Sequence, residues 1–164
     1  MNYTISNGEL TVEISSRGGE FQSIRDKEGR EYLWQGDEAT WTDRGPNLFP
    51  YIGRMTEKSY TYGGKKYNMD IHGFLPYMEM ELVEKKEELL TLCLADSSET
   101  KKQYPFSFAL YITWRLDGQK LFISMKVENR DEKTMYFGIG GHPGFQIPFE
   151  LSLIHIWIFR YPIQ

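Results

Sequence analysis

The segment from Phe106 to Arg115 constrains the fold more than any other part of the chain, because its side chains alternate with a period of two. Large apolar residues occupy every second position, which is typical of a strand with one apolar face and one mixed face. Asp117-Gly118 follows, a signal for a two-residue type I′ turn, and the alternation resumes from Leu121 to Val127. The sequence therefore predicts an antiparallel hairpin here.

Shorter stretches show the same alternation. Their apolar residues are Leu10, Val12 and Ile14; Met78, Met80 and Leu82, then Leu90, Leu92 and Leu94 after a charged turn; Tyr60 and Tyr62, then Tyr67 and Met69 after Gly63-Gly64; and the run from Met135 to Ile139. No window shows the i, i+3, i+4, i+7 pattern of an amphipathic helix. We therefore predict an all-β fold, an antiparallel β-sandwich.

Composition limits the class of protein. The 164 residues include 40% hydrophobic and 26% charged residues, which is typical of a folded domain. The formal net charge of −4 comes from mixed acidic and basic residues without the basic stripe that nucleic-acid binding requires. The N-terminal stretch MNYTISNGEL lacks the features of a signal peptide, and no apolar run is long enough to span a membrane. We expect a cytoplasmic protein with neither nucleic-acid nor membrane partners.

Three ionisable side chains lie in unusual backbone contexts. Residues 36–57 are rich in Gly, Pro and Asp and predict a long ordered loop, which ends near Gly53-Arg54. His72 lies in the run IHGF, and His142 lies in GIGGHPGF. Each of them alone is more often a structural or surface residue. Together they are the candidate site.

Other chemistries fit this pattern poorly. Neither His72 nor His142 has a His, Cys or carboxylate neighbour at the spacing of metal ligands, so we expect no metal. The GIGGHPG run is not a G-x-G-x-x-G fingerprint that opens a helix, so no dinucleotide cofactor is indicated. The chain also lacks the G-x-S-x-G elbow of a serine nucleophile.

The order of five motifs carries a family resemblance. The run NLFPYIGRM, a Tyr-rich hairpin with Gly-Gly, then IHGF, YPFSFALYITWRLDG and IGGHPGF follow one another from about residue 8 to about residue 149. In this order they resemble the aldose 1-epimerase (mutarotase) family, in its LacX-like branch. In the galactose-specific branch an asparagine precedes the acid histidine, whereas Gly141 precedes His142 here, so the identity of the sugar stays open.

The resemblance implies a fold, an activity and residue roles. It implies a galactose mutarotase-like supersandwich that binds a small-molecule aldohexose and interconverts its α and β anomers, an isomerase activity without a cofactor. By resemblance, His142 is the general acid that protonates the ring oxygen, and Arg54 and His72 bind the substrate. Histidine suits proton transfer near neutral pH. Gly140 and Gly141 are expected to let the backbone pass close to a ligand, with Pro143 stiffening the far side.

The C-terminal part departs from the family. Relatives are nearly twice as long, and the family places its carboxylate base downstream, whereas Glu150 is the only carboxylate after His142. The run LSLIHI, from residue 151, resembles a translated transposon-end sequencing adapter. We therefore expect residues 1–150 to be the N-terminal part of one domain and residues 151–164 to be a non-native read-through tail. Such a fragment should aggregate and lack activity.

Two further functions stay open at this point. A sugar-binding β-sandwich of the same ancestry would keep the cleft and need no base. A hexose-6-phosphate 1-epimerase would need further Arg or Lys side chains to bind the phosphate, and Arg54 alone is well placed for this by motif.

Overall fold

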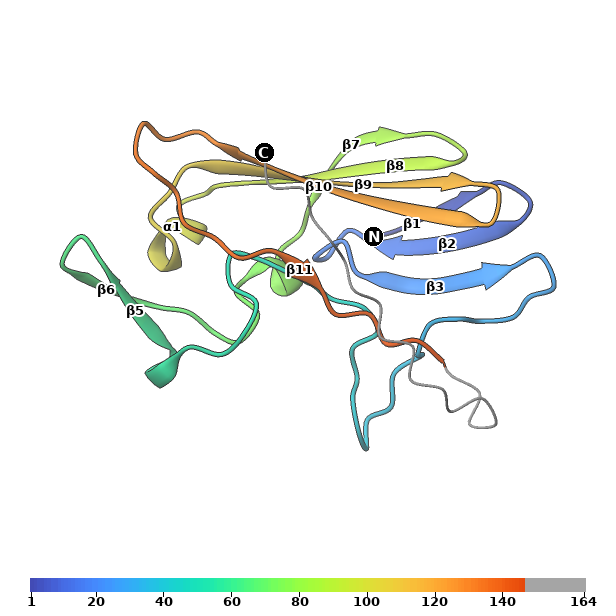
Figure 1. The fold of residues 1–164 in the computed structure, drawn as a ribbon, viewed down its shortest axis with the longest axis horizontal. Coiled ribbons are helices and arrows are strands. Elements are labelled where there is room, and N and C mark those ends of the chain that lie inside the picture. The colour runs from blue at the N-terminus through green and yellow to red at the C-terminus, as the bar shows by residue number, and fades with distance from the viewer. Residues whose placement is uncertain (147–164) are drawn as a thin grey trace.

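The computed structural model describes residues 1–146, which form two antiparallel sheets and two small ladders (Figure 1). The expected tail, residues 151–164, lies outside the described residues. The three-stranded sheet has the order β1-β2-β3, and the four-stranded sheet has the order β10-β9-β8-β7. Their bounds are Asn2–Ser6 (β1), Leu10–Ser15 (β2), Phe21–Asp26 (β3), Glu81–Lys85 (β7), Leu89–Ala95 (β8), Phe108–Asp117 (β9) and Lys120–Asn129 (β10).

The smaller elements connect these sheets. A hairpin joins β5 and β6, and a two-residue ladder pairs β4 with β11. The bounds are Asn47–Leu48 (β4), Ser59–Tyr62 (β5), Lys65–Asn68 (β6), Gly140–Gly141 (β11), Thr100–Gln103 (α1), Thr56–Lys58 (η1) and Leu75–Tyr77 (η2). Within residues 1–146, each helix is far too short to cross a membrane.

The hairpin predicted around residue 117 is confirmed, with a turn displaced by one residue. Asp117 pairs with Lys120, so Asp117 closes β9 and the two-residue connection is Gly118-Gln119. Gly118 has a φ of 53°, a left-handed conformation that glycine adopts at little cost. The alternation from Leu121 to Val127 lies in β10, as predicted.

Other predicted elements differ from the structure. The strand expected from Met135 to Ile139 is absent, since the ladder there consists of β11 alone, directly after it. β7 begins at Glu81 rather than at Met78, because η2 extends to Tyr77 and the backbone of Met78 and Met80 then bonds to Gly18 and Ser16. The helix α1 was not expected, since one turn of four residues leaves no readable period.

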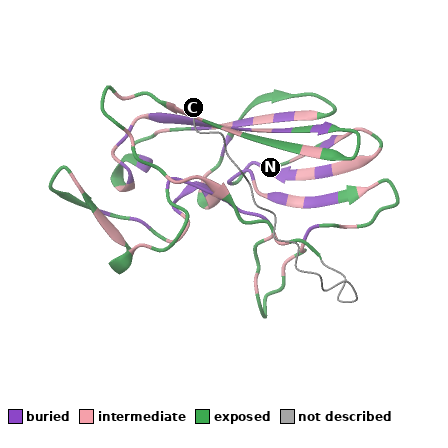
Figure 2. Cartoon of the chain, viewed as in Figure 1, coloured by how far each residue is buried: buried purple, intermediate pink, exposed green. Residues whose placement is uncertain are grey.

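The core lies between the two large sheets. The three-stranded sheet contributes buried side chains such as Ile5, Val12 and Ile14, and β8 and β9 contribute Leu92 and Ile112, all fully buried. Each such side chain stabilises the fold by about 1.5–3 kcal/mol relative to an exposed one. Figure 2 shows these buried positions as purple bands along the strands. The all-β sandwich predicted from the alternation is therefore confirmed.

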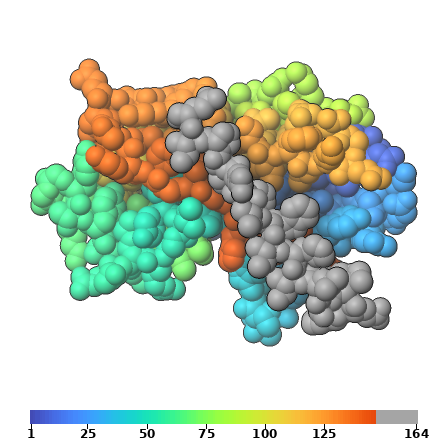
Figure 3. Space-filling view, viewed as in Figure 1, coloured from blue at the N-terminus to red at the C-terminus, as the bar shows by residue number. Residues whose placement is uncertain are grey.

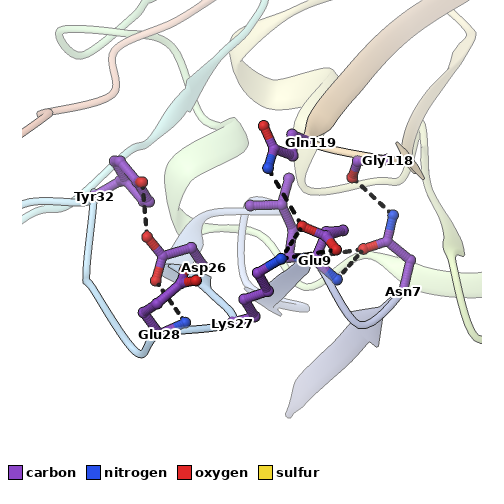
Figure 4. Close-up of polar contacts among 9 residues, drawn as sticks. Asn7, Glu9, Asp26, Lys27, Glu28, Tyr32, Gly118 and Gln119 are labelled. Atoms are coloured by element: carbon purple, nitrogen blue, oxygen red, sulfur yellow. Dashed lines mark hydrogen bonds and ion pairs between the residues drawn. The ribbon is translucent and has the colours of Figure 1, made fainter.

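A polar junction ties the two sheets at one end (Figure 4). Asn7 Nδ2 donates to the carbonyl oxygen of Gly118 at 2.9 Å, which links the β1–β2 turn to the β9–β10 turn. The carboxylate of Glu9 accepts from Lys27 Nζ at 3.2 Å and from Gln119 Nε2 at 3.3 Å. The hydrogen bond from Lys27 holds the pKa of Glu9 below its ordinary value.

Candidate functional site

The imidazole of His72 is fixed through its own backbone. His72 has a φ of 69°, a left-handed conformation that is uncommon for a residue with a side chain. Its N–H donates to Gly53 O at 3.1 Å, and its Nδ1 lies 2.6 Å from Ile52 O. A carbonyl oxygen can only accept, so Nδ1 carries the proton and Nε2 remains for another partner.

The next residue, Gly73, explains how the chain reaches this position. Gly73 has a φ of 75°, and a Cβ built there would lie 2.2 Å from Phe49 O. Both the conformation and the space therefore require glycine. The contact forms an isolated bridge between Phe49 and Gly73, which carries His72 against the loop that the sequence predicted at 36–57.

His142 lies directly after β11 and is anchored by the same loop. Its backbone N–H donates to Pro46 O at 2.9 Å, and Gly144 N–H donates to Arg44 O at 2.8 Å. The β11–β4 ladder pairs Gly141 with Asn47. In the space-filling view the turquoise surface around residues 45–60 lies against the orange-red segment that leads toward residue 146 (Figure 3). The side chain of His142 is exposed.

The structure brings the two histidines together. The ring centroids of His72 and His142 are 5.7 Å apart, although the residues are separated by seventy positions in sequence. The ring of Trp41 is a second neighbour of His142, with centroids 5.1 Å apart and planes tilted by 47°. Two imidazoles at an open surface can exchange protons and hydrogen bonds with one small polar ligand.

Arg54 adjoins this pair through its backbone. It follows Gly53, whose carbonyl accepts from His72, and its own side chain is exposed. Its guanidinium has no hydrogen bond or ion pair with another residue of the described range. The backbone therefore places Arg54 next to the residue that anchors His72, while its guanidinium forms a hydrogen bond with neither histidine.

The glycines around His142 differ in whether a larger side chain would fit at their positions. At Gly140 and Gly141 a Cβ would meet nothing nearer than 3.6 Å, and φ is not left-handed, so the fold itself does not require glycine at either position. At Gly144 a Cβ would lie 2.7 Å from Trp41 Cζ3 and 3.0 Å from Trp34 Cβ. The steric requirement thus belongs to Gly144, which the sequence analysis did not single out.

A cavity of about 610 Å³ lies next to the histidines and shares Ile52 and Gly53 with them. Its other lining residues are largely aromatic, and they include Tyr60 and Tyr104. Burial raises the pKa of Tyr60 to about 12 and raises that of Tyr104 as well, so both phenols stay neutral at ordinary pH. The lining residues within 1–146 include no His, Asp, Glu or Lys, and the histidine pair is the better candidate site.

Several supporting residues escaped the sequence analysis. Glu20 Oε1 accepts from the backbone N–H groups of Arg44 at 2.8 Å and Gly45 at 3.1 Å. Buried Asn47 donates through Nδ2 to Gly18 O and Gly19 O. These contacts hold the loop that anchors His142. They join residues more than twenty positions apart, so no local pattern could have revealed them.

Within residues 1–146 the histidine pair has neither a metal-ligand cluster nor a carboxylate hydrogen-bonded to it. Residues 1–146 contain no group of three His, Cys, Asp or Glu side chains that could hold a metal ion. In the same range, no carboxylate forms a hydrogen bond or ion pair with either imidazole. The arrangement can bind a polar ligand and donate a proton to it.

Comparison with known proteins now decides the family. The model of the family described as aldose 1-epimerase matches residues 1–160. The chain belongs to the aldose 1-epimerase family. The LacX protein encoded on a plasmid of Lactococcus lactis subsp. lactis is 33% identical over 154 residues, which cover 90% of this chain and 52% of that relative.

Solved structures agree with this family. The galactose mutarotase related enzyme from Lactobacillus acidophilus has a TM-score of 0.89 at 38% identity and covers 93% of this chain and 51% of its own. A galactose mutarotase-like protein from Lactobacillus casei ATCC 334 has a TM-score of 0.88 at 33% identity, with 93% and 52% covered. The LacX-like membership and the mutarotase-like fold expected from the motifs are thus confirmed. The chain spans about half the length of these relatives.

Proposed function

We propose that the protein to which these residues belong interconverts the α and β anomers of an aldohexose. The pair of His72 and His142, 5.7 Å apart and anchored by one loop, carries this proposal, because both lie in the motifs IHGF and IGGHPGF that resemble those of the family. Membership of the aldose 1-epimerase family supports a sugar as the substrate. The exposed imidazole of His142 is accessible to a sugar ring.

The proposed mechanism assigns each proton. His142, in its protonated form, donates a proton to the ring oxygen while a carboxylate removes the proton of the anomeric hydroxyl. The bond between C1 and the ring oxygen breaks, the C1–C2 bond rotates, and closure on the other face returns both protons. The carboxylate is expected in the half of the family's length that this chain does not span.

His72 and Arg54 are proposed to bind the sugar. With Nδ1 held by Ile52 O, neutral His72 offers Nε2 as an acceptor for a sugar hydroxyl. The guanidinium of Arg54 offers several donors in a planar fork and is uncommitted among residues 1–146. A non-catalytic sugar-binding protein is the second candidate, because no carboxylate of that range reaches either imidazole.

A chimera tests the proposal. Residues 1–146 would be joined to the C-terminal half of the Lactobacillus acidophilus enzyme, whose fold matches this chain. We expect polarimetry on freshly dissolved sugar to show anomer interconversion above the buffer rate. His142→Asn should lower kcat at least about a hundredfold, the scale of general acid catalysis, with little change in folding.

Arg54→Ala serves as the contrasting variant in the same assay. Because Arg54 is proposed to bind the sugar in its ground state, its loss should raise KM more than it lowers kcat. A chimera that binds sugar but stays at the buffer rate would favour the binding protein. Near-normal rates in His142→Asn would remove His142 from the mechanism.

A further inference from the structure

We propose that Trp41 is a positioning residue for His142, whose imidazole it holds in the orientation that proton donation requires. For its catalytic consequence this inference rests on the proposed function. Trp41 lies in the loop 36–57 that the sequence marked as functional, and neither the family motifs nor the proposed mechanism uses it. Four observations carry the proposal.

The backbone of Trp41 is fixed on its own side of the loop. Its carbonyl oxygen accepts from Asp37 N–H at 2.9 Å and from the indole Nε1 of Trp34, also at 2.9 Å. Asp37 closes the same turn further, because its Oδ1 accepts from Ala39 N–H at 2.8 Å. Two donors on one carbonyl leave the peptide of Trp41 little freedom, so the loop holds the backbone from which its side chain extends.

The loop of Trp41 and the loop of His142 are also joined directly. Trp34 N–H donates to Gly144 O at 2.8 Å, and Gly144 N–H donates to Arg44 O at 2.8 Å. Arg44 is held in turn, because its guanidinium donates to Gln22 O at 2.9 Å. Trp34 and Arg44, which precede and follow Trp41 in the sequence, are thus both bonded to Gly144, two residues after His142. The relative position of the two rings is therefore a property of the fold.

The indole of Trp41 occupies the space that a side chain at Gly144 would need. A Cβ at this position would lie 2.7 Å from Trp41 Cζ3, closer than carbon atoms approach one another. The backbone of Gly144 is not left-handed, so conformation alone does not demand glycine. At Gly140 and Gly141, by contrast, a Cβ would fit. Of these glycines, the one that the fold needs for space is the one in contact with Trp41.

The orientation of the His142 imidazole depends on an aromatic neighbour such as Trp41. The side chain of His142 is exposed, and its ring forms no hydrogen bond with another residue of the described range. The aromatic neighbours of the ring there are Trp41 and His72. An aromatic contact shifts the balance between side-chain orientations by roughly 2- to 10-fold. A general acid must lie within hydrogen-bonding distance of its acceptor, so an imidazole that turns away loses rate.

This role predicts a particular split in the kinetic constants. Trp41 acts through the orientation of His142, which donates its proton in the transition state. Its loss should therefore lower kcat and leave KM nearly unchanged. A wall that merely contacts the sugar would give the opposite result, a higher KM at an unchanged kcat. A purely structural residue would lower the fraction of folded protein, and kcat per folded molecule would then stay unchanged together with KM.

The first test needs no activity and uses the chimera defined above, because the 164-residue chain is expected to aggregate. The ring ¹H and ¹³C resonances of His142 would be assigned by comparison with His142→Asn, then followed in Trp41→Leu and Trp41→Phe. We expect Trp41→Leu to move them toward the values of free histidine and Trp41→Phe to restore part of the shift. Phe122→Leu on β10, where the phenylalanine is 43% exposed, is the matched control and should leave them in place.

Gly144→Ala provides a second variant in case Trp41→Leu does not fold. It keeps Trp41 in the sequence and displaces its ring, so it should move the His142 resonances in the same direction as Trp41→Leu. Should Trp41→Leu not fold, Gly144→Ala and Trp41→Phe decide the question. Unchanged resonances in the folded variants would overturn the proposal.

The second test uses the chimera defined above. We expect Trp41→Leu to lower kcat about 2- to 10-fold, the range of the orientational preference, with KM nearly unchanged, and Trp41→Phe to recover most of the loss. An unchanged kcat, or a rise in KM alone, would overturn the positioning role. If the unsubstituted chimera is inactive while the NMR contact between Trp41 and His142 is present, the proposed function fails and the positioning of the imidazole stands.

Discussion

β9 and β10 are neighbouring strands of one sheet and place apolar side chains on the same face, but that face is covered over β9 and half open over β10. The register sets Trp114 opposite Ile123 and Ile112 opposite Met125. Ile112 and Trp114 are fully buried, whereas Ile123 is 47% exposed. In Figure 2 the purple of β9 has no counterpart along β10.

The difference lies in what covers each strand. The three-stranded sheet packs over β9, as the contact between Phe21 and Trp114, with ring centroids 6.4 Å apart, shows. Between β10 and β3 the sheets instead leave a cavity of about 570 Å³, lined among others by Ile24, Leu121 and Ile123. An alternating pattern thus predicts a strand and its apolar face, while the cover is supplied by residues elsewhere in the chain.

The largest expected effect is a matched pair of truncations in the 164-residue chain. Ile112→Ala should lower the free energy of unfolding by about 2–5 kcal/mol, because it opens a cavity in a closed core. Ile123→Ala should cost less than about 1 kcal/mol, because solvent already reaches that side chain. Urea denaturation followed by tryptophan fluorescence measures both.

The chimera allows the same two substitutions on β9 and β10 to be compared in a longer protein. Relatives are about twice as long as this chain, and the cavity beside Ile123 offers their remaining half a place to pack. If that half covers β10, Ile123→Ala should cost more in the chimera than in the 164-residue chain. Equal costs at Ile112 and Ile123 in the shorter chain would contradict the contrast between the two strands.

A smaller effect is expected on self-association. β10 and β7 are the edges of their sheet within residues 1–146, and unpaired edges recruit other chains. β7 is short, bulged and rich in charge, whereas β10 is ten residues long with apolar side chains half exposed. Ile123→Lys should therefore reduce the oligomeric fraction in size-exclusion chromatography at least about twofold.

Val83→Lys on β7 is the control, since Val83 is 54% exposed on an edge that is already charged, and it should change little. Ending the chain at Glu150 removes the apolar run of residues 153–159 and should reduce association further. A monodisperse 164-residue chain would show that the edge of β10 recruits no partner.

The smallest effect concerns the polar junction around Glu9, which links the β1–β2 turn to the β9–β10 turn. The pKa of Glu9 is lowered by its hydrogen bond from Lys27, so its stabilising contribution is present above the ordinary pKa of a glutamate and is lost as the pH falls through the lowered value. Lys27→Gln should thus lower the urea midpoint slightly at pH 7 and leave it unchanged at pH 3. A loss of equal size at both pH values would exclude the ion pair as its cause.

Local sequence patterns predicted many of the strands but not the contacts between distant segments. The period of two located β9, β10 and the β5–β6 hairpin, since apolar residues recur at alternate positions along each strand. It failed between Met135 and Ile139, where alternation is present but no neighbouring strand completes a ladder. It could not reveal α1, because a single turn has no period.

Local sequence context singled out Arg54, His72 and His142, and the order of motifs assigned their roles. His72 and His142 approach each other because Gly73 meets Phe49 and β11 pairs with β4, contacts that no spacing rule predicts. The resemblance supplied the roles of the two histidines and of Arg54. It could not supply Trp41, whose contact with His142 depends on how the loop 36–57 is closed.

The left-handed backbone at His72 decides what an unbiased mutational library would report at this position. Asparagine, aspartate and glycine tolerate that conformation, whereas β-branched and bulky residues do not. A survival score at position 72 therefore combines two requirements, a backbone that tolerates the left-handed conformation and an imidazole side chain. Asparagine separates them, because it tolerates the conformation but lacks the imidazole. Alanine meets neither requirement, so an alanine scan would attribute the whole loss to the imidazole.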